Sequence, residues 1–309
     1  MVQKVISNQY ETDLHHQILK VCHRLELSLH DNRYGPKIYT NYQRVALIVL
    51  FTRSRKALRD FCSEIRESKW PSWLGLRELP PKSTLHDWLK KYNLSFVRRI
   101  LKKLTRKNEP KIMAVDATGI DSSNKSRHYE KRLKQCGFRQ AYEPYAKADL
   151  LVDTETKLVH DFVLRTKPRH DTIGAKTMFK RLEHEPDIIL GDKGYDSESL
   201  HTILSEKDVL FYAPIRDFHV KRPGGKHRRK CLEPHPNRGM RSIVESVIRS
   251  LKVRLRTLNS KIDYMKKREL GWHILTYNLE VLSKQARACL ILLLRAITIP
   301  DRAITKKPL

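Results

Sequence analysis

Two aspartates interrupt apolar segments at positions where packing alone does not explain a carboxylate. Asp116 follows the apolar residues 112–115 directly before a turn, and Asp192 ends the apolar segment 188–191. An unpaired carboxylate buried in a core costs several kcal/mol, so each side chain is expected at the tip of a strand, facing a cleft. For Asp192 a second interpretation stays open, because a strand-terminal aspartate commonly caps the turn that follows it.

A third acid, Glu245, lies in a segment with helical periodicity. Arg241, Glu245, Arg249 and Lys252 follow at steps of four, four and three, which places them on one helix face. The alternative is a solvated salt-bridge face in which Glu245 pairs with its two arginine neighbours. Residues 241–257 hold five Lys and Arg and one acid, and this imbalance favours a phosphate-binding face. We therefore expect Arg241 and Lys252 to hold phosphates rather than to neutralise Glu245.

Three carboxylates from two strands and one helix, surrounded by cations, suit phosphoryl transfer by two metal ions. Mg²⁺ prefers oxygen ligands and completes its octahedron with water and substrate phosphate. Two ions about 4 Å apart would activate the attacking oxygen and stabilise the leaving oxygen.

The motifs around these acids resemble the DDE triad of insertion-sequence transposases, particularly the IS-four and IS-five groups. Asp116 lies in VDATG, Asp192 in GDKGYD and Glu245 in RSIVESVIRSLK. The second motif of the family, Asp–any–Gly–Tyr, is met by Asp192, Gly194 and Tyr195. The resemblance covers about residues 110–280.

The helical signature of that family is matched in spacing at three of its four positions. The signature is Tyr, two residues, Arg, three residues, Glu, six residues, Lys. Arg241, Glu245 and Lys252 fit it, whereas the Tyr position is occupied by Arg238. An arginine there can still bind phosphate.

The resemblance implies a ribonuclease-H-like fold and an enzyme that cleaves and joins DNA at the ends of an insertion sequence. Asp116, Asp192 and Glu245 would be the catalytic residues and the ligands of two Mg²⁺ ions, for which Mn²⁺ would substitute. The partners implied are double-stranded DNA, as element ends and target, and a second copy of the chain, because two ends must be brought together.

A strongly basic segment separates the last expected strand from the Glu245 helix. Residues 216–241 hold nine Lys and Arg and two acids, a net charge of +7, around Gly224 and Gly225. This composition predicts a flexible loop that clamps the DNA backbone; a disordered surface loop is the plain alternative. The predicted DNA contacts are Lys193, Lys226, Arg228, Arg229, Lys230, Arg238, Arg241, Arg249 and Lys252.

The N-terminal residues 1–108 are expected to form a separate helical region. Apolar spacing predicts helices over 42–50 and 55–65, a loop over 70–81 and a third helix over 83–94 that Ser83 caps. The region holds 22 Lys and Arg against 9 Asp and Glu, a net charge of +13. A helix-turn-helix-like DNA-binding region and a plain basic helical bundle both fit this pattern.

Residues 109–297 alternate strands and helices, which indicates an α/β fold with a mixed sheet flanked by helices. Strands are expected over 111–119, 146–152, 158–164, 187–192 and 209–214. Helices are expected over 172–182, 197–207 and 242–258, and from there to about 297. Residues 298–309 would be a basic tail.

The composition limits the class of protein. The 309 residues are 40% hydrophobic and carry a net charge of +28, which suits a globular protein with a polyanionic partner. No apolar run near the C-terminus reaches the roughly 20 residues of a membrane span, so no membrane partner is expected. Five scattered cysteines fit the reducing cytoplasm, where the protein would act on the nucleoid.

Two other functions fit part of the pattern. A DNA-binding regulator or decayed transposase would keep the charge and the fold without activity, and a nuclease of the same fold would cut without joining. An RNA-binding protein would explain the charge of +28 but not the three acids.

Overall fold

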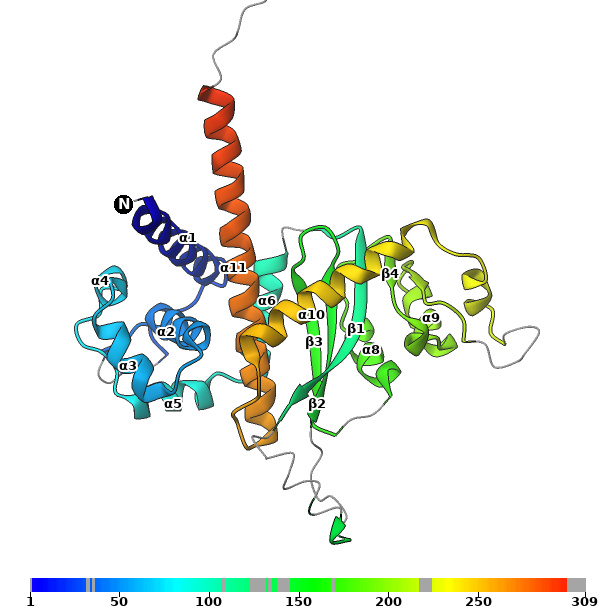
Figure 1. Ribbon diagram of the computed structural model, residues 1–309, viewed down its shortest axis with the longest axis horizontal. Helices are drawn as coiled ribbons and strands as arrows, with labels where there is room; N and C mark the ends of the chain where they lie inside the picture. The colour runs from blue at the N-terminus through cyan, green and yellow to red at the C-terminus, as the bar shows by residue number, and fades with distance from the viewer. Residues whose placement is uncertain are drawn as a thin grey trace, which may run out of the picture.

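The computed structural model of the chain describes residues 2–31, 34, 37–106, 109–122, 132, 135–137, 145–167, 170–216 and 224–298, with side chains described from 9 to 289 within those ranges. It has an N-terminal group of helices and a sheet flanked by helices, and the long helix α11 runs between them (Figure 1). Within the described residues, no helix is both long enough and apolar enough to cross a membrane.

The N-terminal region is helical, as expected. Its helices are α1 (Val2–Arg24), α2 (Asn41–Ser54), α3 (Leu58–Arg66), α4 (Trp70–Trp73), α5 (Lys82–Lys91) and α6 (Leu94–Thr105). At the start of α2 the Thr40 side chain accepts from the Gln43 N–H, and the Gln43 side chain accepts from the Thr40 N–H. This reciprocal cap satisfies two backbone donors that the first turn leaves unpaired.

Three local predictions for this region were wrong. The expected loop over 70–81 contains the one-turn helix α4, which begins at Trp70. Ser83 is not a cap, because α5 already begins at Lys82 after an extended Pro81. The third helix also ends early, at Lys91, because the Asn93 side chain accepts from the Phe96 N–H and so caps α6.

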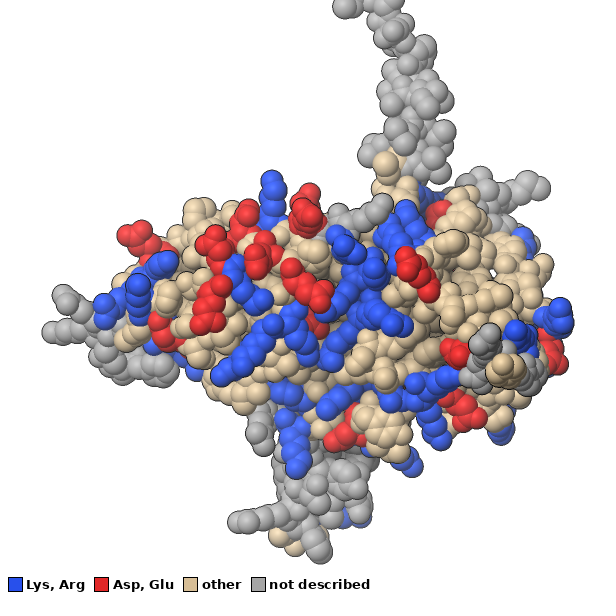
Figure 2. Space-filling view, turned by 180° about the vertical axis from the view of Figure 1, so that it is seen from behind, with Lys and Arg blue, Asp and Glu red and all other residues tan. Residues whose placement is uncertain are grey.

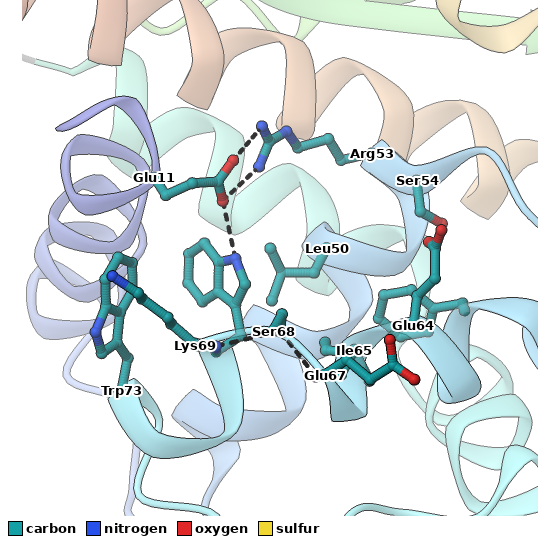
Figure 3. A pocket seen from close by; sticks show the side chains of 12 residues that line it. Glu11, Leu50, Arg53, Ser54, Glu64, Ile65, Glu67, Ser68, Lys69 and Trp73 are labelled. Carbon is teal, nitrogen blue, oxygen red and sulfur yellow. Dashed lines mark hydrogen bonds and ion pairs between the residues drawn. The ribbon is translucent and has the colours of Figure 1, made fainter. Parts of the chain in front are cut away.

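Glu11 of α1 holds three of these helices together (Figure 3). Its carboxylate accepts two hydrogen bonds from the guanidinium of Arg53 in α2, at 2.8 and 2.5 Å, and one from the indole N–H of Trp70 in α4, at 2.8 Å. These groups line a cavity of about 670 Å³ between the helices. A bidentate pair with an arginine fixes orientation as well as contributing energy.

The second region is built on a five-stranded sheet in the order β3-β2-β1-β4-β5. Antiparallel pairing joins β1 to β2 and β2 to β3, whereas β4 runs parallel to both β1 and β5. The strands are β1 (Ile112–Asp121), β2 (Tyr145–Asp153), β3 (Val159–Arg165), β4 (Ile188–Leu190) and β5 (Leu210–Tyr212).

Helices cover both faces of this sheet. On one face, α8 (Asp171–Lys180) and α9 (Glu198–Ser205) pack against Met113, Val115 and Leu151. On the other face, α10 (Ser242–Leu255) and α11 (Asp263–Thr298) pack against Ala114 and Leu150. Short 3₁₀ turns precede α9 and α10: η1 (Lys193–Tyr195), η2 (Arg228–Cys231) and η3 (Pro236–Arg241). The expected α/β fold with a mixed sheet and N-terminal helices is confirmed.

Helix α11 contributes to both hydrophobic cores. Its Trp272, Leu275 and Leu279 pack with the buried residues of α1 and α2, while Leu270 and Ile274 pack against the sheet. The N-terminal helices are therefore fixed to the sheet by a helix from the other end of the chain. Residues 107 and 108, at the expected domain boundary, and residues 299–309 of the expected tail lie outside the described residues.

Candidate active site

Asp116 lies within β1, which continues to Asp121, so the expectation of a strand tip and a turn at this residue was wrong. Asp192 follows the end of the neighbouring strand β4. Strand β4 pairs in parallel with β1, with Leu190 beside Ala114. Two residues further along each chain come Asp192 and Asp116. Because side chains alternate between faces, both aspartates are expected on the face of Ala114 and Leu190, which is the face that α10 covers.

The Asp116 side chain is 15% exposed, and its two oxygens have different partners. Oδ1 accepts from the Ala117 N–H at 2.8 Å, and Oδ2 lies 3.3 Å from the guanidinium of Arg241. Burial raises the pKa of Asp116. The hydrogen bond from the Ala117 N–H and the charge of Arg241 lower this pKa, whereas the charges of Asp192 and Glu245 raise it further. The three predicted acids therefore lie close enough to one another for their charges to interact.

Asp192 caps the turn that follows its strand, so the second interpretation from the sequence is also true. Its Oδ1 accepts from the Gly194 N–H at 2.7 Å at the start of η1. A Cβ at position 194 would lie 2.8 Å from that same oxygen, which is closer than real Cβ atoms approach. The glycine of the Asp–any–Gly motif is therefore required by the position of the Asp192 carboxylate.

Glu245 lies in the first turn of α10 with its side chain 55% exposed. Its carboxylate pairs with Arg241 at 2.8 Å, and Arg241 also contacts Asp116. The expectation that Arg241 does not neutralise Glu245 was therefore wrong. The reason is that η3 ends at Arg241 beside Asp116 of β1, so the guanidinium lies between two carboxylates.

These residues fit a divalent metal in donor type and in charge. They offer carboxylate oxygens only, and the pKa of Asp116 is raised first by burial and then, to a smaller extent, by the charges of Asp192 and Glu245. Among the described residues, however, no three His, Cys, Asp or Glu side chains are gathered as a metal site, and Arg241 supplies the positive charge.

The loop that carries Asp192 is held by two arginines. Arg216 donates to the backbone carbonyls of Lys193 and Gly194, at 2.6 and 2.9 Å. Arg228 makes two hydrogen bonds, at 2.6 and 2.5 Å, to Asp196, whose side chain is fully buried. Burial opposes ionisation of Asp196, but the hydrogen bonds from Arg228 bring its pKa below the ordinary value. Arg228, predicted to contact DNA, is thus engaged in a buried ion pair.

The other predicted DNA contacts have exposed side chains, and their contact with DNA stays a prediction. The described part of residues 216–241 forms η2 and η3 rather than a flexible loop. Residues 217–223 of this segment lie outside the described residues. The residues concerned are Lys193, Lys226, Arg229, Lys230, Arg238, Arg249 and Lys252.

A second charged cluster lies beside the site, and its buried pair of Asp149 and Arg165 was not predicted from the sequence. Asp149 is fully buried and accepts three hydrogen bonds from the Arg165 side chain, while Lys147 pairs with Asp171. Burial raises the pKa of Asp149 to about 7 against the opposing effect of Arg165. Asp149 interrupts an apolar strand as Asp116 does, so the same rule could have found it. Tyr195 is also fully buried, and its hydroxyl has no hydrogen-bond partner in the described structure.

Comparisons with known proteins give one family. A comparison with curated proteins finds no match. One similar solved structure is a piggyBac transposase synaptic complex with hairpin DNA, with a TM-score of 0.40 and 11% identity over 89% of this chain and 73% of that chain. A likeness at that level supports no statement about function. Residues 107–279 match the family model of the transposase DDE domain, which is 173 of the 309 residues. The chain therefore belongs to the DDE transposase family and is a DDE-type transposase.

Proposed function

We propose that this transposase binds the ends of an insertion sequence and catalyses metal-dependent cleavage and strand transfer of DNA at Asp116, Asp192 and Glu245. The observation that supports the proposal is the link that Arg241 makes between Asp116 and Glu245. Asp116 and Asp192 each follow by two residues the paired positions Ala114 and Leu190 of the parallel strands β1 and β4.

The three carboxylates would hold two Mg²⁺ ions, with Mn²⁺ as a substitute. When bound, such a pair of ions activates the attacking oxygen and stabilises the leaving oxygen. Arg241 pairs with both Asp116 and Glu245, so a metal ion held by these two carboxylates would compete with its guanidinium. If Arg241 gave up these pairs, it would remain beside the site, where it could hold a phosphate of the DNA.

The basic side chains around this site support a polyanionic substrate. Arg249 and Lys252 are exposed on α10, and neither has a carboxylate partner among the described residues. Figure 2 shows the opposite side of the molecule from Figure 1, where α10 lies in front of the sheet; on that opposite side basic and acidic side chains are interspersed, and basic ones gather along the middle. We propose double-stranded DNA as the partner, and a homodimer on DNA because two ends must be joined. Its place of action would be the nucleoid in the cytoplasm.

The helical residues 1–108 would supply most recognition of the element ends, and residues 109–297 the catalysis. Their net charge of +13 supports this division. A fragment that begins at Pro110 lacks α1, α2 and α6, against which α11 packs, so truncation would also disturb the fold. Recognition is better tested in the full chain by substituting exposed basic residues of α5, such as Lys82 and Lys90.

The test of the catalytic proposal uses conservative substitutions in the full chain. Asp116→Asn, Asp192→Asn and Glu245→Gln should each abolish cleavage and strand transfer in Mg²⁺ while end binding stays within a few fold. Asp187→Asn is a matched control, since this exposed aspartate directly precedes β4, the strand that Asp192 follows. Joining of DNA at nearly the normal rate by any of the three variants would remove that residue from the site. Cleavage without any joining by the unaltered protein would favour the nuclease.

A further inference from the structure

A second cavity, of about 790 Å³, lies between the N-terminal helices and the connection from α10 to α11. Its walls come from the α2–α3 turn, from α5 and from residues 254–273. None of the three candidate catalytic acids lines it. Glu245 and Arg254 are nine residues apart on α10, or about 14 Å at 1.5 Å per residue, so this cavity is distinct from the candidate active site.

The cavity is strongly basic. Five of the cations that line it have no carboxylate partner among the residues that the structure describes: Arg55, Lys90, Arg256, Lys261 and Arg268. The one acidic side chain in its lining, Glu269, is already engaged, because it accepts from the backbone N–H groups of Asn259 and Ser260 at 2.9 Å. Unpaired positive charge in a concave surface attracts phosphates.

The same cavity offers aromatic and apolar surface. The Tyr264 side chain is 46% exposed, and the guanidinium of Arg268 lies 4.8 Å from the centre of its ring. Two residues earlier in the chain, Ile262 is 55% exposed. The indole of Trp272 also lines the cavity, and its buried N–H has no hydrogen-bond partner in the described structure. A buried donor without an acceptor is uncommon in proteins, and a ligand acceptor would satisfy it.

The backbone of the cavity wall is strained at Arg256. This residue has φ 54° and ψ −75°, and the Thr257 N–H donates to the Leu255 carbonyl across it at 2.6 Å. Such a γ-turn is rare for a residue with a side chain. A bond from the Leu258 N–H to the Asp121 carbonyl, at 2.9 Å, anchors the connection to the end of β1. Strained backbone of this kind gathers at sites that bind ligands.

We propose that this cavity binds an unpaired segment of a DNA strand, with phosphates on the unpaired cations and a base stacked against Tyr264. Cationic grooves with aromatic side chains are typical of single-strand binding, because every base offers a flat face for stacking. A duplex keeps its base faces inside its own stack, so it would leave the apolar lining unused. The inference rests on the proposed function, because the unpaired segment would come from DNA ends that the transposase has cleaved.

The test measures binding of the full-length protein to a labelled oligothymidylate of about 15 nucleotides, without divalent metal, by fluorescence anisotropy. Tyr264→Ala should weaken binding about 5- to 150-fold, the equivalent of one lost base stack, whereas Tyr264→Phe should keep the affinity within a few fold. Lys261→Ala should lower the slope of log affinity against log salt by about 0.7, the value for one phosphate contact on a single strand. Lys180→Ala, an exposed lysine of α8, and Tyr34→Ala, an exposed tyrosine, do not line the cavity and serve as controls.

Two results would overturn the inference. One is an affinity for oligothymidylate that Tyr264→Ala and Lys261→Ala leave unchanged. The other is a loss of affinity in these variants that is as large for a duplex of the same length as for oligothymidylate, because the cavity would then be a general surface for duplex DNA. The assay contains no divalent metal and requires no cleavage, so a failure of the catalytic proposal is distinguishable from a failure of this one. Thermal melting of each variant checks that the fold is retained.

Discussion

Removing Arg241 should destabilise the metal-free protein, because this residue is the counter-ion of two candidate catalytic acids. The guanidinium lies 3.3 Å from Asp116 and 2.8 Å from Glu245. At an effective dielectric constant of about 20, the Asp116 contact alone corresponds to about 5 kcal/mol of attraction before desolvation is subtracted. Exposed pairs contribute about 0–1 kcal/mol and the breaking of buried pairs costs about 3–5 kcal/mol. With Asp116 15% exposed and Glu245 55% exposed, Arg241→Ala should cost about 1–3 kcal/mol.

The dependence of this loss on pH identifies its cause. The pKa of Asp116 is already raised by burial and by its acidic neighbours, and loss of Arg241 should raise it further. A carboxyl whose pKa is raised on folding destabilises the protein above its unfolded pKa, because the unfolded state then releases its proton more readily. The difference in free energy of unfolding between Arg241→Ala and the unaltered protein should therefore be largest at neutral pH. It should shrink as the pH falls through the folded-state pKa of Asp116 towards about 4.

The assay is thermal melting in a chelator, repeated in Mg²⁺. A free-energy loss of about 1–3 kcal/mol lowers the melting temperature by roughly 2–12 °C in domains of this size. Mg²⁺ should restore part of the loss, since a bound cation replaces the missing charge. Arg249→Ala is the matched control, because this exposed arginine is on the same helix and lacks a carboxylate partner in the described structure. Equal melting of Arg241→Ala and Arg249→Ala in the chelator would refute the reasoning.

Two further substitutions separate structural from functional roles near the site. Arg228→Ala should lower the free energy of unfolding by about 3–5 kcal/mol, because it leaves the buried Asp196 carboxylate without its ion-pair partner. Chemical denaturation measures this loss. Unchanged stability together with weakened DNA binding would instead support Arg228 as a DNA contact. Gly194→Ala should lower strand transfer about 100-fold, since the new Cβ must displace the Asp192 carboxylate. Gly239→Ala, which meets no atom within 4 Å, should be nearly normal, and similar rates for both variants would contradict the role given to Gly194.

The order of the elements and the three candidate acids could be predicted from the residues alone. Apolar strands and amphipathic helices have different periods, so the five strands and the helices between them could be predicted from residue spacing. An acid at the end of an apolar strand stands out against its surroundings, and this made Asp116 and Asp192 recognisable. The family motifs then identified Glu245 in a helix that otherwise has the pattern of a salt-bridge face.

Which charged side chains neutralise one another depends on the tertiary structure and could not be predicted from the sequence. Arg228 and Asp196 are 32 residues apart in the chain, and Arg241 and Asp116 are 125 apart, so no periodicity connects them. Their side chains meet because β1 and β4 are neighbours in the sheet and the chain returns to them through η2 and η3. The same is true of the basic cavity, which gathers residues from α2, α5 and the α10–α11 connection. Charge counts along a sequence measure how many cations a segment has, but the fold decides which of them remain free to bind a phosphate.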